Sequence, residues 1–262
     1  MHFPFIPEPA MFPPSARLAS LGLCTPLLLL GAAPPARAER PNTVLAAEVE
    51  RAIVEQTNQF RKDNQLPSLK LDNDLTACAS TFARFMAKTE KYGHQADGRT
   101  PAQRARDAGY AYCVVRENIA YRTNPGEVTA AGLIEVFVQG WIDSPPHRES
   151  MLAEYVTETG VGVESDDGVT YYAVQLFGRP KSASIELTIL NESTVAQELI
   201  IEANDSVDQV QLPPRTSLKM VRCFPTTLRL ENAETELVLT ESAELTITAE
   251  GIQRQPQGAA LK

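Results

Sequence analysis

The sequence predicts an α+β protein in which a region of mixed helices and strands precedes an all-β region. Up to Pro180, stretches with helical spacing alternate with stretches rich in β-branched and aromatic residues. After Pro180, short alternating runs such as SASIELTIL and QELIIEA are separated by Asn, Asp, Ser and Pro. We therefore expect one domain over residues 39–180, a small β-sandwich over residues 181–250 and a polar tail over residues 251–262.

Four stretches before Pro180 have helical spacing. The first covers residues 43–66 and is ended by Pro67, and the second covers about 73–91 with Asp72 or Asn73 as its cap. Thr100-Pro101-Ala102-Gln103 combines a capping threonine, a first-turn proline and a glutamine that can close a capping box, so we expect a third helix that Gly109 ends. A fourth helix is expected over residues 127–142.

Strands are predicted between and after these helices. The segment YAYCVVRENIAY, residues 110–121, has the composition of a strand. TGVGVE and TYYAVQLFG flank SDDGV, whose Asp167-Gly168 is a strong turn signal, so these residues are expected to form a hairpin.

Charge and composition limit the partners. The chain has 262 residues, a formal net charge of −9 and a sequence pI near 5.0. No run of Lys and Arg is present to neutralise phosphates, which argues against nucleic acid as a partner. An acidic soluble protein is the expected class.

The N-terminal residues 1–38 are predicted to be a signal peptide. Arg17 precedes LASLGLCTPLLLLGAA, an apolar run too short to span a bilayer, and Ala36-Arg37-Ala38 fits a cleavage site. Residues 1–10 carry no Lys or Arg, so we expect translation to begin at Met11. The mature protein is then secreted or periplasmic without a stable membrane span, and the alternative is a retained anchor.

Export favours oxidation of the cysteines that remain after Cys24 is removed. Cys78 and Cys113 lie in one half of the chain with 34 residues between them, and we predict that they form a disulfide. Cys223 is then left over. It is either buried and unpaired or available to a partner chain, and we favour burial.

Three residues of the mixed region are candidates for chemistry. His94 follows Tyr92-Gly93 in a loop, and His147 follows Ser144-Pro145-Pro146, a pattern that places its ring in the first turn of a helix. The backbone field there favours a neutral imidazole that can bind metal or accept a proton. Glu117 lies in an apolar segment, where a carboxylate needs partners, and two imidazoles would serve.

Four separated motifs resemble the CAP superfamily of cysteine-rich secretory, antigen 5 and pathogenesis-related proteins, in its bacterial SCP-like form. They are YGHQADGRTPAQRARDAGY, RENIAY, GWIDSPPHRESML and the hairpin TGVGV with YYAVQLFG, and they occur in the family's order over about residues 45–180. The resemblance implies an α-β-α sandwich.

The resemblance also implies a cleft in which two histidines and two acidic residues can hold a divalent metal. His94, Glu117 and His147 match three of these positions, and Ser144 stands where the second glutamate would lie, next to Asp143. Two imidazoles and one carboxylate can still bind zinc. Ser144 can instead cap its helix.

Three functions fit these residues. The first is a secreted binding module whose cleft takes a divalent metal, a small apolar molecule, a peptide or an envelope component, with the β-domain available to a protein partner. The second is a metal-dependent hydrolase using His94, Glu117 and His147, or a metal-free one with Ser144 as nucleophile. The third is a structural extracellular domain. We expect binding rather than catalysis.

Other residues are expected to have structural roles. Trp141 lies on the apolar face of its predicted helix and is expected in the core. Arg116 and Arg148 are expected to form ion pairs, and the group Arg99, Arg104 and Arg106 is expected to form a solvated helix face.

Overall fold

The computed structural model describes residues 41–204, 206–233 and 235–255. The predicted signal peptide, the start at Met11 and Cys24 lie outside the described residues. Within the described part of the chain, no helix is long and apolar enough to cross a membrane.

The mixed region is built on one four-stranded sheet with strand order β1-β3-β4-β2. Its strands are β1 (Lys70–Leu71), β2 (Tyr112–Thr123), β3 (Glu158–Glu164) and β4 (Thr170–Pro180). Strand β2 pairs antiparallel with β4, and β3 and β4 form the predicted hairpin. Because β2 is the last strand of the sheet, its outer edge is open to groups from neighbouring loops and helices.

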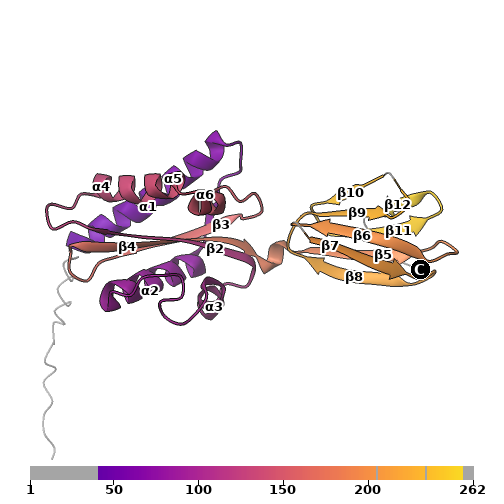
Figure 1. Cartoon of the computed structure of the whole chain (residues 1–262), viewed down its shortest axis with the longest axis horizontal. Coiled ribbons are helices and arrows are strands. Elements are labelled where there is room, and N and C mark those ends of the chain that lie inside the picture. Colours follow the sequence, from indigo (N-terminus) through magenta and orange to yellow (C-terminus); the bar gives the residue numbers. More distant parts are fainter. Residues whose placement is uncertain (1–40, 205, 234, 256–262) are drawn as a thin grey trace, which may run out of the picture. The chain divides into compact units, whose positions relative to one another are not determined.

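Helices cover both faces of this sheet, as Figure 1 shows. One face carries α2 (Asn73–Thr89) and α3 (Pro101–Asp107). The other carries α1 (Pro41–Asp63), α4 (Ala130–Ile134), a π-helix (Glu135–Gln139), α5 (Gly140–Asp143) and α6 (Pro145–Met151). Each face has its own apolar core, and Trp141 is buried in the one beneath α1. The α-β-α sandwich is confirmed.

Two predicted N-terminal caps of helices are present in the structure. Asp72 is the N-cap of α2 and accepts a hydrogen bond from the Leu75 amide. Thr100 and Gln103 form the complete capping box of α3. The fourth predicted helix is divided into α4, the π-helix and α5, which run on without a break in the chain.

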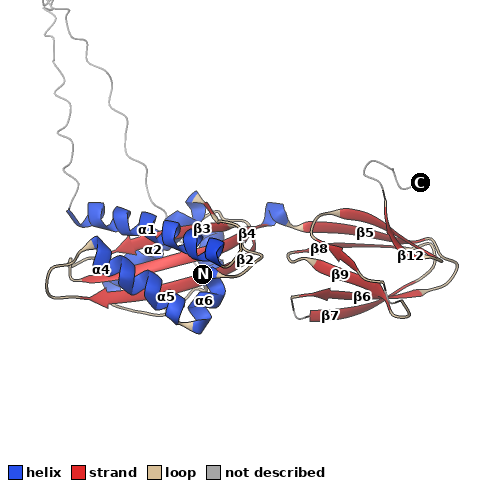
Figure 2. Ribbon diagram, turned by 90° about the horizontal axis from the view of Figure 1, so that it is seen from above, coloured by secondary structure: helices blue, strands red, loops and turns tan. Residues whose placement is uncertain are grey.

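After the short 3-10 helix Lys181–Ala183, the described residues form strands only (Figure 2). Two four-stranded sheets have the orders β10-β9-β6-β7 and β12-β11-β5-β8 and share one apolar core. Their strands are β5 (Ile185–Asn191), β6 (Gln197–Ala203), β7 (Ser206–Leu212), β8 (Ser217–Arg222), β9 (Thr226–Leu230), β10 (Leu237–Leu239), β11 (Ala243–Thr248) and β12 (Gly251–Arg254). We call residues 185–254 the C-terminal β-region.

The predicted polar tail requires a correction. Residues 251–254 form β12, which pairs antiparallel with β11 from Leu245↔Arg254 to Thr248↔Gly251. The pairing places Ile252 against the apolar core of the C-terminal β-region. Residues 256–262 lie outside the described part.

The disulfide prediction was wrong. Cys113 pairs with Cys223, and Cys78 is a free, buried thiol. Cys78 lies on the inner side of α2 within the apolar core, where burial raises its pKa to about 11. Cys113 lies at an irregularity in the β2–β4 pairing, between Tyr112 and Val114, and such a bulge changes the direction of a side chain.

Two glycines of β3 let α2 pack directly on the sheet. A methyl group on Gly162 would overlap the backbone of Ala79 and Ser80, and one on Gly160 would overlap the backbone of Leu75 and Thr76. Side chains at these positions would therefore force the helix away from the strand.

We expect Gly162→Ala to lower the free energy of unfolding by about 1–3 kcal/mol, because it overpacks this interface. Chemical denaturation of both proteins measures the change. Gly140→Ala is the matched control, because a methyl group there meets nothing within 4 Å and Gly140 has helical backbone angles. The control is expected to keep or raise stability. Equal effects of the two substitutions would contradict the close approach of α2.

Candidate functional site

Strand β2 places polar side chains on both faces of the sheet at its open edge. Glu117 and Ile119 point to the face covered by α2 and α3, and Ile119 packs in that core. Asn118, the residue between them, points to the opposite face and donates from Nδ2 to the His147 carbonyl of α6, at 3.0 Å. The strand therefore connects the His94 loop on one face with α6 on the other.

Glu117 is buried, with 1% of its side chain exposed, and both of its oxygens are bonded. Oε1 lies 2.8 Å from His94 Nδ1, and Oε2 accepts from Arg104 Nη2 at 2.7 Å. The sequence predicted two imidazoles as partners. The structure supplies one imidazole and one guanidinium, so the buried carboxylate is paired with a cation.

Arg104 is the functional residue that the sequence reasoning missed. Its side chain is only 3% exposed, so the prediction of a solvated helix face was wrong for this arginine. Nη1 bonds to Asp97 Oδ1 at 2.9 Å and to the His94 carbonyl at 3.0 Å, and the guanidinium lies 3.4 Å from the centre of the Phe82 ring. Arg104 thus fixes both the Glu117 carboxylate and the loop that carries His94. Nothing in the local sequence distinguishes it from Arg106.

The contact with Glu117 determines which nitrogen of His94 is free. A carboxylate only accepts hydrogen bonds, so the hydrogen of the neutral His94 ring lies on Nδ1 and Nε2 keeps its lone pair. Half of the His94 side chain is exposed. The loop is tied to β2 a second time, because the Tyr92 hydroxyl donates to the Ile119 carbonyl at 3.1 Å. His94 is therefore held in place by Glu117 while half of its side chain stays accessible.

His147 lies in the first turn of α6, as predicted, with Ser144 at the N-cap position. Burial lowers the pKa of the imidazole, and the charge of nearby His94 lowers it further. The neutral ring was predicted from the helix terminus, and burial and a second histidine favour the same form. Among the described residues, His147 Nδ1 is buried without a hydrogen-bond partner. An unpaired buried nitrogen can bind a ligand that the protein does not itself supply.

Ser144 does not use its side chain as a cap. Its backbone carbonyl accepts from the Arg148 amide at 2.8 Å, but the hydroxyl makes no capping bond. No side chain of a general base contacts that hydroxyl among the described residues, so the structure gives no support to Ser144 as an activated nucleophile. Arg116 forms the predicted ion pair, with Glu149 at 2.6 Å.

The predicted metal ligands were His94, Glu117 and His147. Of these three, the structure leaves only the two imidazoles as possible donors. Both Glu117 oxygens are engaged, and among the described residues no group of three or more His, Cys, Asp or Glu is arranged to hold a metal. His94 and His147 are the two residues that could supply nitrogen donors to a divalent transition metal, with Glu117 contacting His94 at Nδ1. Glu117 thus has a supporting role in this geometry.

Comparison with known proteins identifies the family of the segment that contains these residues. Residues 54–177 match the model of the Cysteine-rich secretory protein family, CAP. This segment is a CAP domain. It contains His94, Glu117, Arg104 and His147, so the CAP domain includes the whole candidate site.

Proteins similar to the CAP domain occur in several bacteria. YkwD of Bacillus subtilis is 32% identical over 138 residues, which are 50% of this chain and 51% of YkwD. The chain therefore spans about half the length of that relative. An outer surface protein of Borrelia burgdorferi is 24% identical with a TM-score of 0.45, covering 51% of this chain and 93% of that one. An extracellular SCP-domain protein of Bacillus anthracis has the same identity and TM-score, covering 56% and 45%.

Proposed function

We propose that this chain is an exported binding protein whose His94 and His147 hold a divalent transition metal, with zinc as the first candidate. The observation that supports this most directly is the buried, unpaired nitrogen of His147 together with the accessible ring of His94. Glu117 holds His94 by Nδ1, and His147 has an unpaired buried nitrogen and a lowered pKa. Neutral imidazole is the form that binds metal.

The chain's own residues prepare the site in three ways. Arg104 keeps the buried Glu117 carboxylate paired, Glu117 orients the His94 ring, and Asn118 holds the backbone of His147. A bound metal would supply a positive centre with open positions for water or for a donor atom of a ligand. A peptide, an envelope component or a small apolar molecule with one such donor atom is the expected ligand class, with export through the predicted signal peptide.

Zinc binding to the chelator-treated chain tests this proposal. Calorimetric titration is expected to show one site in the parent protein and none in His94→Ala or His147→Ala, because each removes one of the two nitrogen donors. Glu117→Gln is expected to weaken binding about 10-fold to 100-fold, the usual cost of losing a group that orients a metal ligand. Circular dichroism establishes that each variant is folded.

Asp143→Asn is the matched control, because this exposed carboxylate lies four residues before His147 and bonds only to Gln139 among the described contacts. It is expected to bind zinc as the parent does. Unchanged zinc binding in both histidine variants would overturn the proposal. Chelator-sensitive turnover of peptides or esters by the parent would favour the hydrolase, and loss of folding in both variants without zinc binding in the parent would favour the structural domain.

A further inference from the structure

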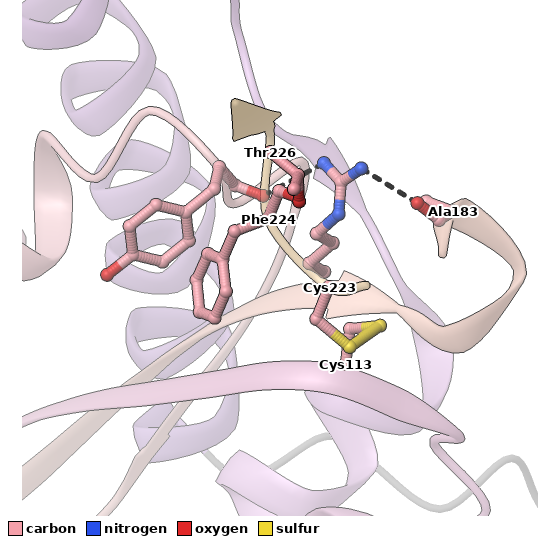
Figure 3. The surroundings of a disulfide bond; sticks show 7 residues. Cys113, Ala183, Cys223, Phe224 and Thr226 are labelled. Atoms are coloured by element: carbon pink, nitrogen blue, oxygen red, sulfur yellow. Dashed lines mark hydrogen bonds between the residues drawn. A yellow bond between two sulfur atoms is a disulfide. The ribbon is translucent and has the colours of Figure 1, made fainter. Parts of the chain in front are cut away.

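The disulfide connects the CAP domain with the C-terminal β-region close to α6. Cys113 lies at the start of β2, and Cys223 directly follows β8 (Figure 3). Both cysteines are half-buried, so a small reductant can reach them. Cys78, by contrast, is buried, and burial raises its pKa to about 11, which keeps it out of thiol exchange.

The residue after Cys223 makes an aromatic contact with the CAP domain. Phe224 packs edge to face on Tyr155, with ring centres 4.9 Å apart. Tyr155 lies between α6 and β3, and its hydroxyl accepts from Arg116 Nη1 at 2.7 Å. Arg116 belongs to β2, three residues after Cys113. The disulfide is attached to β2 at Cys113, and the aromatic pair contacts the same strand through the bond between Tyr155 and Arg116.

Arg116 in turn binds α6. Nη2 bonds to Glu149 Oε1 at 2.6 Å, and Nε donates to Ser150 Oγ at 3.3 Å. Helix α6 has only seven residues and includes His147. Beside these bonds lies a cavity of about 560 Å³ lined by Arg116, Pro145, Arg148, Glu149, Leu152, Ala153, Tyr155 and Asn204. On this side α6 is held by the arginine rather than by close packing.

We propose that the Cys113–Cys223 disulfide is a redox-controlled brace that positions α6, and with it His147, through Phe224, Tyr155 and Arg116. In the oxidised protein the bond keeps Phe224 against Tyr155, which fixes the hydroxyl that Arg116 requires. A dithiol reductant transfers two electrons and two protons to the disulfide, which yields two cysteine thiols and leaves the reductant as a disulfide. Phe224 then loses its covalent anchor, and α6 loses part of its support.

Hydrogen exchange of the α6 amides tests the brace without any metal. In the full chain, the amides of residues 147–151 are expected to exchange severalfold faster after dithiothreitol treatment and in the Cys113→Ser/Cys223→Ser protein. The α2 amides, residues 73–89, are the internal reference in Phe224→Ala, where the disulfide is intact, and are expected to keep their rates there. Phe224→Ala should accelerate α6 with the disulfide intact, and Tyr155→Phe should do so by removing only the hydroxyl.

Val238→Ala is the matched control, because this exposed side chain lies on β10 of the same β-region, and it is expected to leave α6 unchanged. Unchanged α6 rates in the reduced protein and in Phe224→Ala would overturn the brace. Equal acceleration of α2 and α6 in Phe224→Ala would also overturn it, because the aromatic contact would then stabilise the whole fold without selecting α6.

The same proteins separate this inference from the proposed metal site. If His147 holds zinc, the Cys113→Ser/Cys223→Ser and Phe224→Ala proteins are expected to bind zinc more weakly, and Val238→Ala is not. A protein that binds no zinc but shows the α6 acceleration would refute the metal site and retain the brace.

Discussion

Replacement of Arg104 by methionine is expected to lower the free energy of unfolding by about 3–5 kcal/mol, because it leaves the Glu117 carboxylate buried without its cation. Methionine fills much of the arginine's volume and retains an apolar contact with the Phe82 ring, so the loss reports mainly the charge. The substitution also removes the bonds to Asp97 and to the His94 carbonyl, so the His94 loop is expected to become more mobile. Denaturant unfolding measures the first effect and hydrogen exchange of residues 92–99 measures the second.

Two further proteins make this experiment specific. Arg99→Met removes a neighbouring arginine whose side chain is 46% exposed, and it is expected to change stability by about 0.5 kcal/mol or less. The double variant Arg104→Met/Glu117→Gln removes both buried charges and is expected to be more stable than Arg104→Met alone. A cost below about 1 kcal/mol for Arg104→Met would contradict the buried pair.

Loss of the Cys113–Cys223 disulfide is expected to lower stability by about 2–4 kcal/mol. The two cysteines are 110 residues apart, and closing so long a loop removes much conformational freedom from the unfolded chain. On the chain-entropy account alone, a loop of about this length gives about 4.7 kcal/mol, so the expected loss lies below this limit. Thermal and urea unfolding of the parent and the Cys113→Ser/Cys223→Ser protein measure the loss.

Dithiothreitol provides the control for this loss. It is expected to destabilise the parent to the level of the double variant and to leave the double variant unchanged. Peptide mass mapping after alkylation should find Cys113 and Cys223 labelled in the reduced native protein and Cys78 unlabelled, because burial raises the pKa of Cys78 to about 11. Labelling of Cys78 together with protection of Cys113 would show that the pairing differs.

Much of the site could be predicted because its positions are set by local signals. Ser144-Pro145-Pro146 places His147 in the first turn of α6, and the apolar segment around Glu117 predicts that this carboxylate is buried. The partners of these residues could not be predicted in the same way. Glu117 required a partner because it is buried, but that requirement is met equally well by an imidazole or by a guanidinium. Only the approach of α3 to β2 made Arg104 that partner.

The sequence by itself determined the elements of this protein. The capping box of Thr100 and Gln103, the cap at Asp72 and the turn at Asp167-Gly168 act through neighbours in the chain, so their effects can be predicted without the fold. Tertiary structure alone decided the contacts between distant residues. Cys113 pairs with Cys223 rather than Cys78 because Cys78 is buried in the core beneath α2 while Cys113 lies at an irregularity of β2. The physical reason is that disulfides and buried ion pairs depend on the distance and direction of two side chains, which the folded backbone fixes and the spacing in the sequence does not.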